Sequence, residues 1–175
     1  MAHINVECKA VCADLATIEQ QLIALNALHI GTDEQVDTYF VVPNGRLKLR
    51  EGNIENALIY YERADTATAK LSKVILYTHD KSEALKAILL ATHTVQVVVT
   101  KTRKIFFINN VKFHLDTLAE LGTFVEIEAI SDAVHCTKEL LQVQCDYYIQ
   151  LLGIAQHHFI AQSYSNMIMG MQSNS

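Results

Sequence analysis

Charged and apolar residues alternate in four segments that lie far apart in this sequence, and this alternation limits the possible folds more than any other feature. The charged residues are Glu7 and Lys9, then Arg46, Lys48 and Arg50, then Lys101 and Arg103, and finally Glu126 and Glu128. Side chains two apart in a β-strand project to the same side of a sheet. Each segment therefore predicts a strand with one charged face and one apolar face.

Further strands are expected where β-branched and aromatic residues cluster. The full set of candidate strands is residues 4–11, 36–42, 46–50, 58–63, 73–78, 95–104, 105–108, 111–115 and 123–127. Pro-Asn-Gly at residues 43–45 predicts a turn, and Asn-Asn at residues 109–110 predicts a tight hairpin.

Three amphipathic helices are predicted from apolar residues at helical spacing and from capping residues at their ends. The first runs from an Asp14 N-cap to a Gly31 C-cap, the second opens at Asp80, and the third opens at Ser131 or Asp132 and ends at Gly153. A short segment is expected to follow as far as Met171. We expect residues 1–171 to form one domain and residues 172–175 to be a frayed tail.

The helices need apolar surface to pack on, and the apolar faces of the strands provide it. If the helices lie outside the sheet, the charged faces must point inward at one another. For a single strand, a charged face in contact with water is an equally good interpretation. Four such strands together favour an α+β fold in which about eight strands close into a barrel with a charged lumen.

Composition and charge exclude several classes of protein. The formal net charge of −5 argues against nucleic acid as a partner. The first ten residues lack the pattern of a signal peptide, and no apolar run approaches the length that crosses a bilayer, so we expect a cytoplasmic protein with no membrane partner. The cysteines, Cys8, Cys12, Cys136 and Cys145, form no C-x-x-C pair, and we expect them to be reduced and buried.

The charges of the predicted lumen indicate what it binds, because buried ionised groups need partners. Its candidate cations are Lys9, Arg46, Lys48, Arg50, Arg63, Lys101 and Arg103. Arginine in particular matches the geometry of phosphate oxygens. Glu7, Glu126 and Glu128 are separate carboxylates of the kind that join Mg²⁺ or Mn²⁺ to substrate phosphates. Together these residues predict a site for a small-molecule triphosphate.

The same residues resemble the motifs of the CYTH domain proteins, also called triphosphate tunnel metalloenzymes. N-V-E-C-K at residues 5–9 is similar to the E-x-E-x-K signature of that family, with Asn5 in place of the first glutamate. Further similar motifs are D-T-Y-F at 37–40, R-L-K-L-R at 46–50, Y-E-R-A-D at 61–65 and K-T-R at 101–103. F-H-L-D at 113–116, L-G-T-F-V-E-I-E at 121–128 and S-Y-S-N-M at 163–167 resemble the class IV adenylate cyclase branch most.

The resemblance implies an antiparallel eight-stranded tunnel with flanking helices, a divalent metal ion and a triphosphate substrate. In a cyclase the ribose 3′-hydroxyl of ATP attacks the α-phosphorus, whereas in the triphosphatase relatives water attacks the γ-phosphorus. We assign Glu7, Glu126 and Glu128 to the metal, and Arg46, Lys48, Arg50, Arg63, Lys101 and Arg103 to phosphate. Lys9 either holds phosphate or helps to activate the nucleophile, so Lys9, Glu7 and Arg63 are the candidate catalytic residues. Asp37, Asp116 and His114 are weaker candidates for substrate binding, and a structural role for His114 is favoured over a catalytic one.

Three functions stay open at this stage. Adenylate cyclase is the first choice and inorganic, thiamine or nucleoside triphosphatase the second. The third is a protein that binds a triphosphate or polyphosphate without converting it, because Asn5 removes one negative charge from the acidic cluster. Relatives of the cyclase branch also suggest a homodimer.

Overall fold

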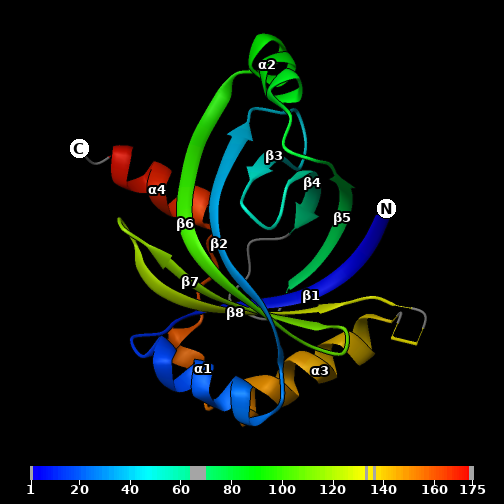
Figure 1. The fold of residues 1–175 in the computed structure, drawn as a ribbon, viewed down its shortest axis with the longest axis vertical. Coiled ribbons are helices and arrows are strands. Elements are labelled where there is room, and N and C mark those ends of the chain that lie inside the picture. Colours follow the sequence, from blue (N-terminus) through cyan, green and yellow to red (C-terminus); the bar gives the residue numbers. More distant parts are fainter. Residues whose placement is uncertain (1, 64–69, 133, 136, 174–175) are drawn as a thin grey trace.

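A computed structural model describes residues 2–63, 70–132, 134–135 and 137–173. Across these residues the chain forms an antiparallel β-barrel with helices around it (Figure 1). Its strands are β1 (Ala2–Val11), β2 (Leu28–Phe40), β3 (Arg46–Glu51), β4 (Ala57–Arg63), β5 (Lys70–Thr78), β6 (Val95–Ile108), β7 (Val111–Leu118) and β8 (Gly122–Ile130). Its helices are α1 (Leu15–Ala24), α2 (Glu83–Thr92), α3 (Lys138–Leu151), the 3₁₀ turn η1 (Gln156–His158) and α4 (Tyr164–Ser173).

The eight strands close into a ring in the order β1-β5-β4-β3-β2-β6-β7-β8, and β8 pairs with β1 to complete it. The predicted closed antiparallel barrel is therefore confirmed. Closure leaves no unpaired sheet edge. It also gives every strand an inner and an outer face, so the alternation in the sequence decides which side chains enter the lumen.

The first helix is shorter than predicted. It begins after an Asp14 N-cap, as expected, but it ends at Ala24, and Asn26 takes the left-handed conformation with φ 56°. The amides of Asn26 and Ala27 donate to the carbonyls of Ile23 and Leu22, which is a Schellman motif. The predicted C-cap, Gly31, instead lies at an irregularity in β2. Asparagine adopts this conformation more readily than most residues, so it ends the helix early.

The other two predicted helices exist, but their predicted N-caps are wrong. Ser82 caps α2 by accepting from the Leu85 amide, and Thr137 caps α3 by accepting from the Leu140 amide. Ser131 Oγ is engaged elsewhere, accepting from the Ile4 amide of β1. Asp132, in turn, accepts from the amide of His135 in the loop before α3. Asp80 precedes the α2 cap by two residues, and α3 ends as predicted, with Gly153 at φ 67°.

Several strands are longer than the sequence indicates. The two runs expected at 95–104 and 105–108 form one strand, β6, which pairs with β2 along nearly its whole length. The turns predicted at 43–45 and 109–110 are confirmed, with Gly45 and Asn109 at positive φ. The segment expected to reach Met171 contains a helix, α4, which continues through Ser173.

Apolar side chains pack in several clusters, and two of these clusters position α1, α3 and α4. Outside the barrel, α1 and α3 cover the outer faces of β1, β7 and β8, with Leu22, Leu141 and Cys145 buried among residues such as Val6 and Ile127. The helix α4 lies beside β6 (Figure 1). At one end of the lumen it packs on inward-facing side chains. This second cluster consists of Tyr39, Val97, Val99, Leu118, Phe124, Tyr164 and Ile168. The helix therefore covers one end of the barrel with apolar groups.

The thiols of Cys8, Cys12 and Cys145 are free, and burial raises the pKa of Cys145 to about 12. The remaining cysteine, Cys136, lies outside the described residues. None of the helices in the described ranges is long and apolar enough to cross a membrane.

Candidate functional site

The barrel encloses a cavity of about 610 Å³ that is lined by side chains from all eight strands. Of the predicted site residues, Glu7, Lys9, Asp37, Lys48, Arg50, Lys101, Arg103, His114, Glu126 and Glu128 line it. Residues from the two ends of the sequence therefore meet in one space, as the alternation predicted. This volume lies within the usual range for a small-molecule site.

The Glu126 carboxylate contacts three nitrogen-bearing side chains from β1, β6 and β7. Its carboxylate oxygens lie 3.0 Å from Lys9 Nζ, 2.7 Å from Arg103 Nη2 and 3.1 Å from His114 Nδ1. Lys9 and His114 are directly opposite Glu126 in the register of β1, β8 and β7. Burial raises the pKa of Glu126, but the charges of Lys9 and Arg103 outweigh burial and hold that pKa well below its usual range.

His114 is neutral in this environment. Burial, followed by the charge of Arg103, lowers its pKa to about 3, although Glu126 opposes the shift. Its Nε2 atom is buried and has no hydrogen-bond partner among the described residues. A neutral imidazole that bonds a carboxylate through one nitrogen keeps the second nitrogen available for a hydrogen bond.

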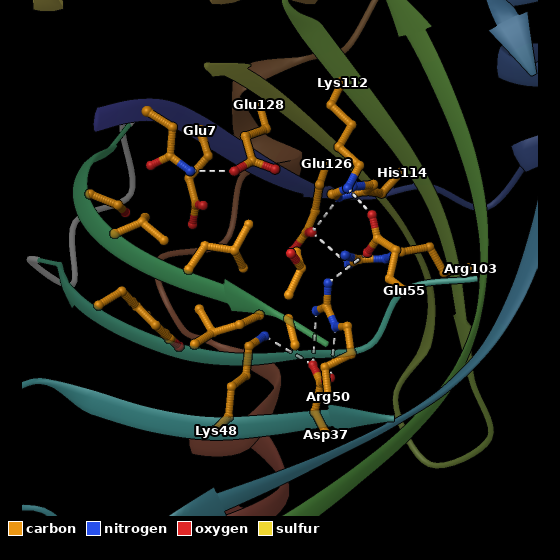
Figure 2. A pocket seen from close by; sticks show the side chains of 18 of the residues that line it. Glu7, Asp37, Lys48, Arg50, Glu55, Arg103, Lys112, His114, Glu126 and Glu128 are labelled. Atoms are coloured by element: carbon orange, nitrogen blue, oxygen red, sulfur yellow. Dashed lines mark hydrogen bonds and ion pairs between the residues drawn. The ribbon is translucent and has the colours of Figure 1, made fainter. Parts of the chain in front are cut away.

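Asp37 is the second centre of charge (Figure 2). It accepts from Lys48 Nζ at 2.9 Å, from Lys101 Nζ at 2.8 Å, and from Arg50 through Nε at 2.8 Å and Nη2 at 3.0 Å. Burial raises the pKa of Asp37, but these three cations keep it well below the usual range. Burial lowers the pKa of Lys101 to about 7, and the neighbouring charges of Arg50 and Arg103 contribute.

A tyrosine from α4 connects the covering helix to the charged lumen. Tyr164 donates from its hydroxyl group to Asp116 at 2.7 Å, and Lys9 Nζ lies 3.4 Å from the centre of the Tyr164 ring. Asp116 also receives two hydrogen bonds from Arg103. The sequence placed Asp116 among possible substrate ligands, but it is fully buried and holds Arg103 in position.

Glu7, Glu128 and Asn5 form an acidic end of the cavity. Glu7 and Glu128 are directly opposite in the register of β1 and β8, and Asn5 Nδ2 donates to Glu128. Burial and the charge of Glu7 raise the pKa of Glu128, although the charge of Lys112 opposes them. Asn5 Oδ1 is buried without a partner among the described residues. Carboxylate and amide oxygens therefore gather at this end of the cavity.

The acidic end suits a divalent ion that arrives with its substrate. Among the described residues, no three Asp, Glu, His or Cys side chains are grouped so that they could hold a metal ion by themselves. Mg²⁺ is commonly bound by one or two carboxylates together with substrate phosphates and water. The hard oxygen atoms of Glu7, Glu128 and Asn5 fit that arrangement. Glu126, the third predicted metal ligand, is engaged by Lys9 and Arg103.

Two of the predicted phosphate ligands, Arg46 and Arg63, are not among the described residues that line the cavity. The Arg46 guanidinium lies 5.9 Å from the centre of the Tyr61 ring, and Arg46 is absent from the residues that line the cavity. Arg63 ends β4, and its side chain lies outside the described part of the chain. Their proposed roles stay predictions.

The structure also adds residues that sequence reasoning missed. Lys112 lines the cavity from β7, and its spacing from His114 and Asp116 was the signal that could have revealed it. Glu55 lines the cavity from the connection between β3 and β4, where no periodicity predicts which way a side chain points. Tyr164 was part of a quoted motif, but its contact with Lys9 depends on the position of α4.

One wall of the cavity is largely apolar. The inward side chains of β4 and β5 include Ala57, Ile59, Tyr61, Val74 and Leu76. Among the described residues, the charged side chains that line the cavity come from the other six strands and from the connections. The lumen therefore offers a charged region and an apolar region to the same ligand.

The CYTH domain family model matches residues 3–157. Among solved structures, the PH1012 protein from Pyrococcus horikoshii OT3 has a TM-score of 0.79 at 24% identity, over 93% of this chain and 98% of that one. A Vibrio parahaemolyticus protein, provisionally described as an adenylate cyclase, has a TM-score of 0.79 at 15% identity, over 97% and 99% of the two chains.

A third similar structure is HpAC1 from Hippeastrum, a provisional adenylyl cyclase described as having a dominant triphosphatase activity. Its TM-score is 0.62 at 12% identity, over 98% of this chain and 96% of that one. No curated protein sequence matches the chain significantly. At these identities the structures share the fold with this chain.

Proposed function

The chain belongs to the CYTH domain family, and from this premise we propose that it binds a triphosphate and a divalent metal ion inside the barrel and converts the triphosphate. The observation that carries the proposal is the meeting of Lys9, Lys48 and Lys101 with the acidic pair Glu7 and Glu128 in one cavity. Cations beside a carboxylate pair are what a metal-bound polyphosphate requires.

The charge balance of the cavity supports the metal requirement. The described residues that line it include six Lys or Arg side chains and six Asp or Glu side chains. The protein therefore has little surplus positive charge for a triphosphate, which carries several negative charges. A divalent ion, Mg²⁺ or Mn²⁺, supplies positive charge to the phosphates when it is bound. Glu7, Glu128 and Asn5 are the residues that would hold it.

The apolar wall favours an organic triphosphate over an inorganic one. A nucleoside or similar group placed against Ile59, Tyr61 and Leu76 would bury apolar surface, which an inorganic chain cannot do. Adenylate cyclase of class IV type is accordingly our first choice, with ATP converted to cyclic AMP and pyrophosphate.

In this proposal the chain itself contributes binding and orientation. Lys48 and Lys101 hold phosphate oxygens, and Asp37 positions both of these lysines. Arg103 positions Glu126, and α4 keeps water from one end of the lumen. Lys9 lies between Glu126 and the Tyr164 ring, where it contacts either a phosphate or the attacking hydroxyl group. Glu7 and Arg63 remain candidate catalytic residues from the sequence.

Two alternatives each have an observation in their favour. The dominant triphosphatase activity described for the Hippeastrum protein favours hydrolysis, in which water attacks the γ-phosphorus. Asn5 in place of the first glutamate of the signature removes one negative charge from the acidic end, which favours binding without conversion. A cytoplasmic location and a homodimer stay proposals from the sequence.

Product analysis distinguishes the three functions. The protein is incubated with ATP and Mn²⁺, and the products are separated by chromatography. Cyclic AMP with pyrophosphate identifies a cyclase, and ADP with phosphate identifies a triphosphatase. Binding of ATP with neither product identifies a binding protein and refutes conversion of this nucleotide. Absence of binding refutes the proposed ligand.

A further inference from the structure

The Glu55 carboxylate places a negative charge of the protein inside the lumen. Its Oε2 atom accepts from Arg50 Nη1 at 2.9 Å and from Gln35 Nε2 at 3.1 Å, and its Oε1 atom accepts from Lys112 Nζ. Donors from β2, β3 and β7 therefore converge on one carboxylate, and Figure 2 shows it between Arg50 and Lys112. Charged nitrogen donors in such an arrangement also suit phosphate oxygens.

The backbone places Glu55 there without help from its carboxylate. Asp33 Oδ1 accepts from the Ile54 amide at 2.8 Å, and Asp33 Oδ2 accepts from the Glu55 amide at 3.0 Å. Asn56 Oδ1 accepts from the Gly52 amide at 3.1 Å. Removing the charge of Glu55 would therefore leave these contacts of the β3–β4 connection in place.

Both cationic partners turn toward Glu55 although each faces another carboxylate. Arg50 already donates twice to Asp37, and its Nη1 atom is directed to Glu55. Lys112 is opposite Glu128 in the register of β7 and β8, yet its ammonium group contacts Glu55. The Glu55 side chain is 25% exposed, so this contact lies at the wall of the cavity and not behind it.

We propose that Glu55 occupies an anion site of the lumen and competes with ligand phosphates for Arg50 and Lys112. The inference rests on the proposed triphosphate binding and adds a residue that limits which phosphate positions the lumen accepts. The negative charge of Glu55 repels a phosphate that reaches this site and so weakens its binding. Lys9, Lys48 and Lys101 are outside this contact.

Binding of inorganic triphosphate in the presence of Mg²⁺ tests the proposal, measured by calorimetry on the full chain. Glu55→Gln keeps the size of the side chain and frees the two cations, so we expect about tenfold tighter binding, because like-charge contacts are costly. Glu19→Gln is the matched control. Glu19 accepts from Lys104 Nζ at 2.6 Å, and neither residue lines the cavity. We expect that control to bind as the unaltered chain does.

A second substitution separates competition from a structural effect. The double variant Glu55→Gln with Lys112→Gln should bind more weakly than Glu55→Gln, because one of the two freed cations is gone. Unchanged or weaker binding by the folded Glu55→Gln variant would overturn the proposal. Equal affinities of the double variant and Glu55→Gln would also overturn it, because Lys112 would then contribute nothing to the gain. These results concern binding, so they are independent of whether ATP is converted.

Discussion

At the scale of single residues, the site depends on lysines whose charge is set by their surroundings. Lys101 is 3% exposed and shares Asp37 with Lys48 and Arg50. Its pKa of about 7 is far below the usual value, first because of burial and then because of nearby arginines. The sequence identified Lys101 as a cation of the lumen, but neighbours from three strands decide how readily it is protonated.

Lys101 should take up a proton when a triphosphate binds. Near pH 8 its folded-state pKa of about 7 leaves it mostly neutral, and an anion beside it favours the charged form. Calorimetric titrations in two buffers of different ionisation enthalpy should therefore differ, and Lys101→Met should remove most of the difference. Equal heats in both buffers for the unaltered chain would contradict this assignment.

The same shift has a consequence for stability. The unfolded chain keeps the ordinary lysine pKa of 10.5, so between about pH 7 and 10.5 it binds a proton that the folded chain does not. The contribution of Lys101 to the free energy of unfolding therefore increases with pH across this window. Denaturant titrations of the chain and of Lys101→Met at several pH values would reveal the difference.

At the scale of elements, the short connections place side chains in the lumen as the strands do. The sequence predicts the existence of most strands and helices, because their apolar periodicity is strong. It misplaces the ends of α1, α2 and α3, since several polar residues near each end could serve as the cap. The connection between β3 and β4 carries no periodic signal, yet it brings Glu55 into the lumen and fixes it through Asp33.

Gly52→Ala should destabilise the chain. A Cβ atom at Gly52 would lie 2.5 Å from Asp33 Oδ1, an atom held by the Ile54 amide. We expect a loss of about 1–3 kcal/mol in the free energy of unfolding, the usual cost of such crowding. Gly170→Ala is the control, because its added Cβ meets no atom within 4 Å apart from the local backbone of α4, and alanine favours helix. Equal stability of the two variants in urea would refute the crowding.

At the scale of the whole molecule, barrel closure converts scattered charges into a site that is nearly balanced. Cations from β1, β3, β6 and β7 meet carboxylates from β1, β2, β8 and the β3–β4 connection. Many of these charges contact one another directly, as Asp37 and Glu126 do with their cations. The fold therefore carries the charges without requiring a bound ligand to compensate them.

Removal of metal should accordingly affect ligand binding but not folding. A chelator should leave the melting temperature of the chain unchanged, because internal ion pairs already hold the lumen together. It should weaken triphosphate binding by at least about tenfold, since the phosphates lose the positive charge that comes with them. Thermal unfolding and calorimetry, each with and without chelator, test both parts. A large fall in melting temperature would point to a structural metal instead.

The sequence by itself determined most of the strand side chains that face the lumen, because a strand has a period of two and closure turns that period into an inside and an outside. It also determined the family, through motifs spread along the chain. Only the tertiary structure decided that Glu126 pairs with Lys9 and Arg103 and that Glu55 enters between Arg50 and Lys112. Pairing depends on register between strands that are distant in the sequence and on the path of a connection, and neither leaves a local pattern.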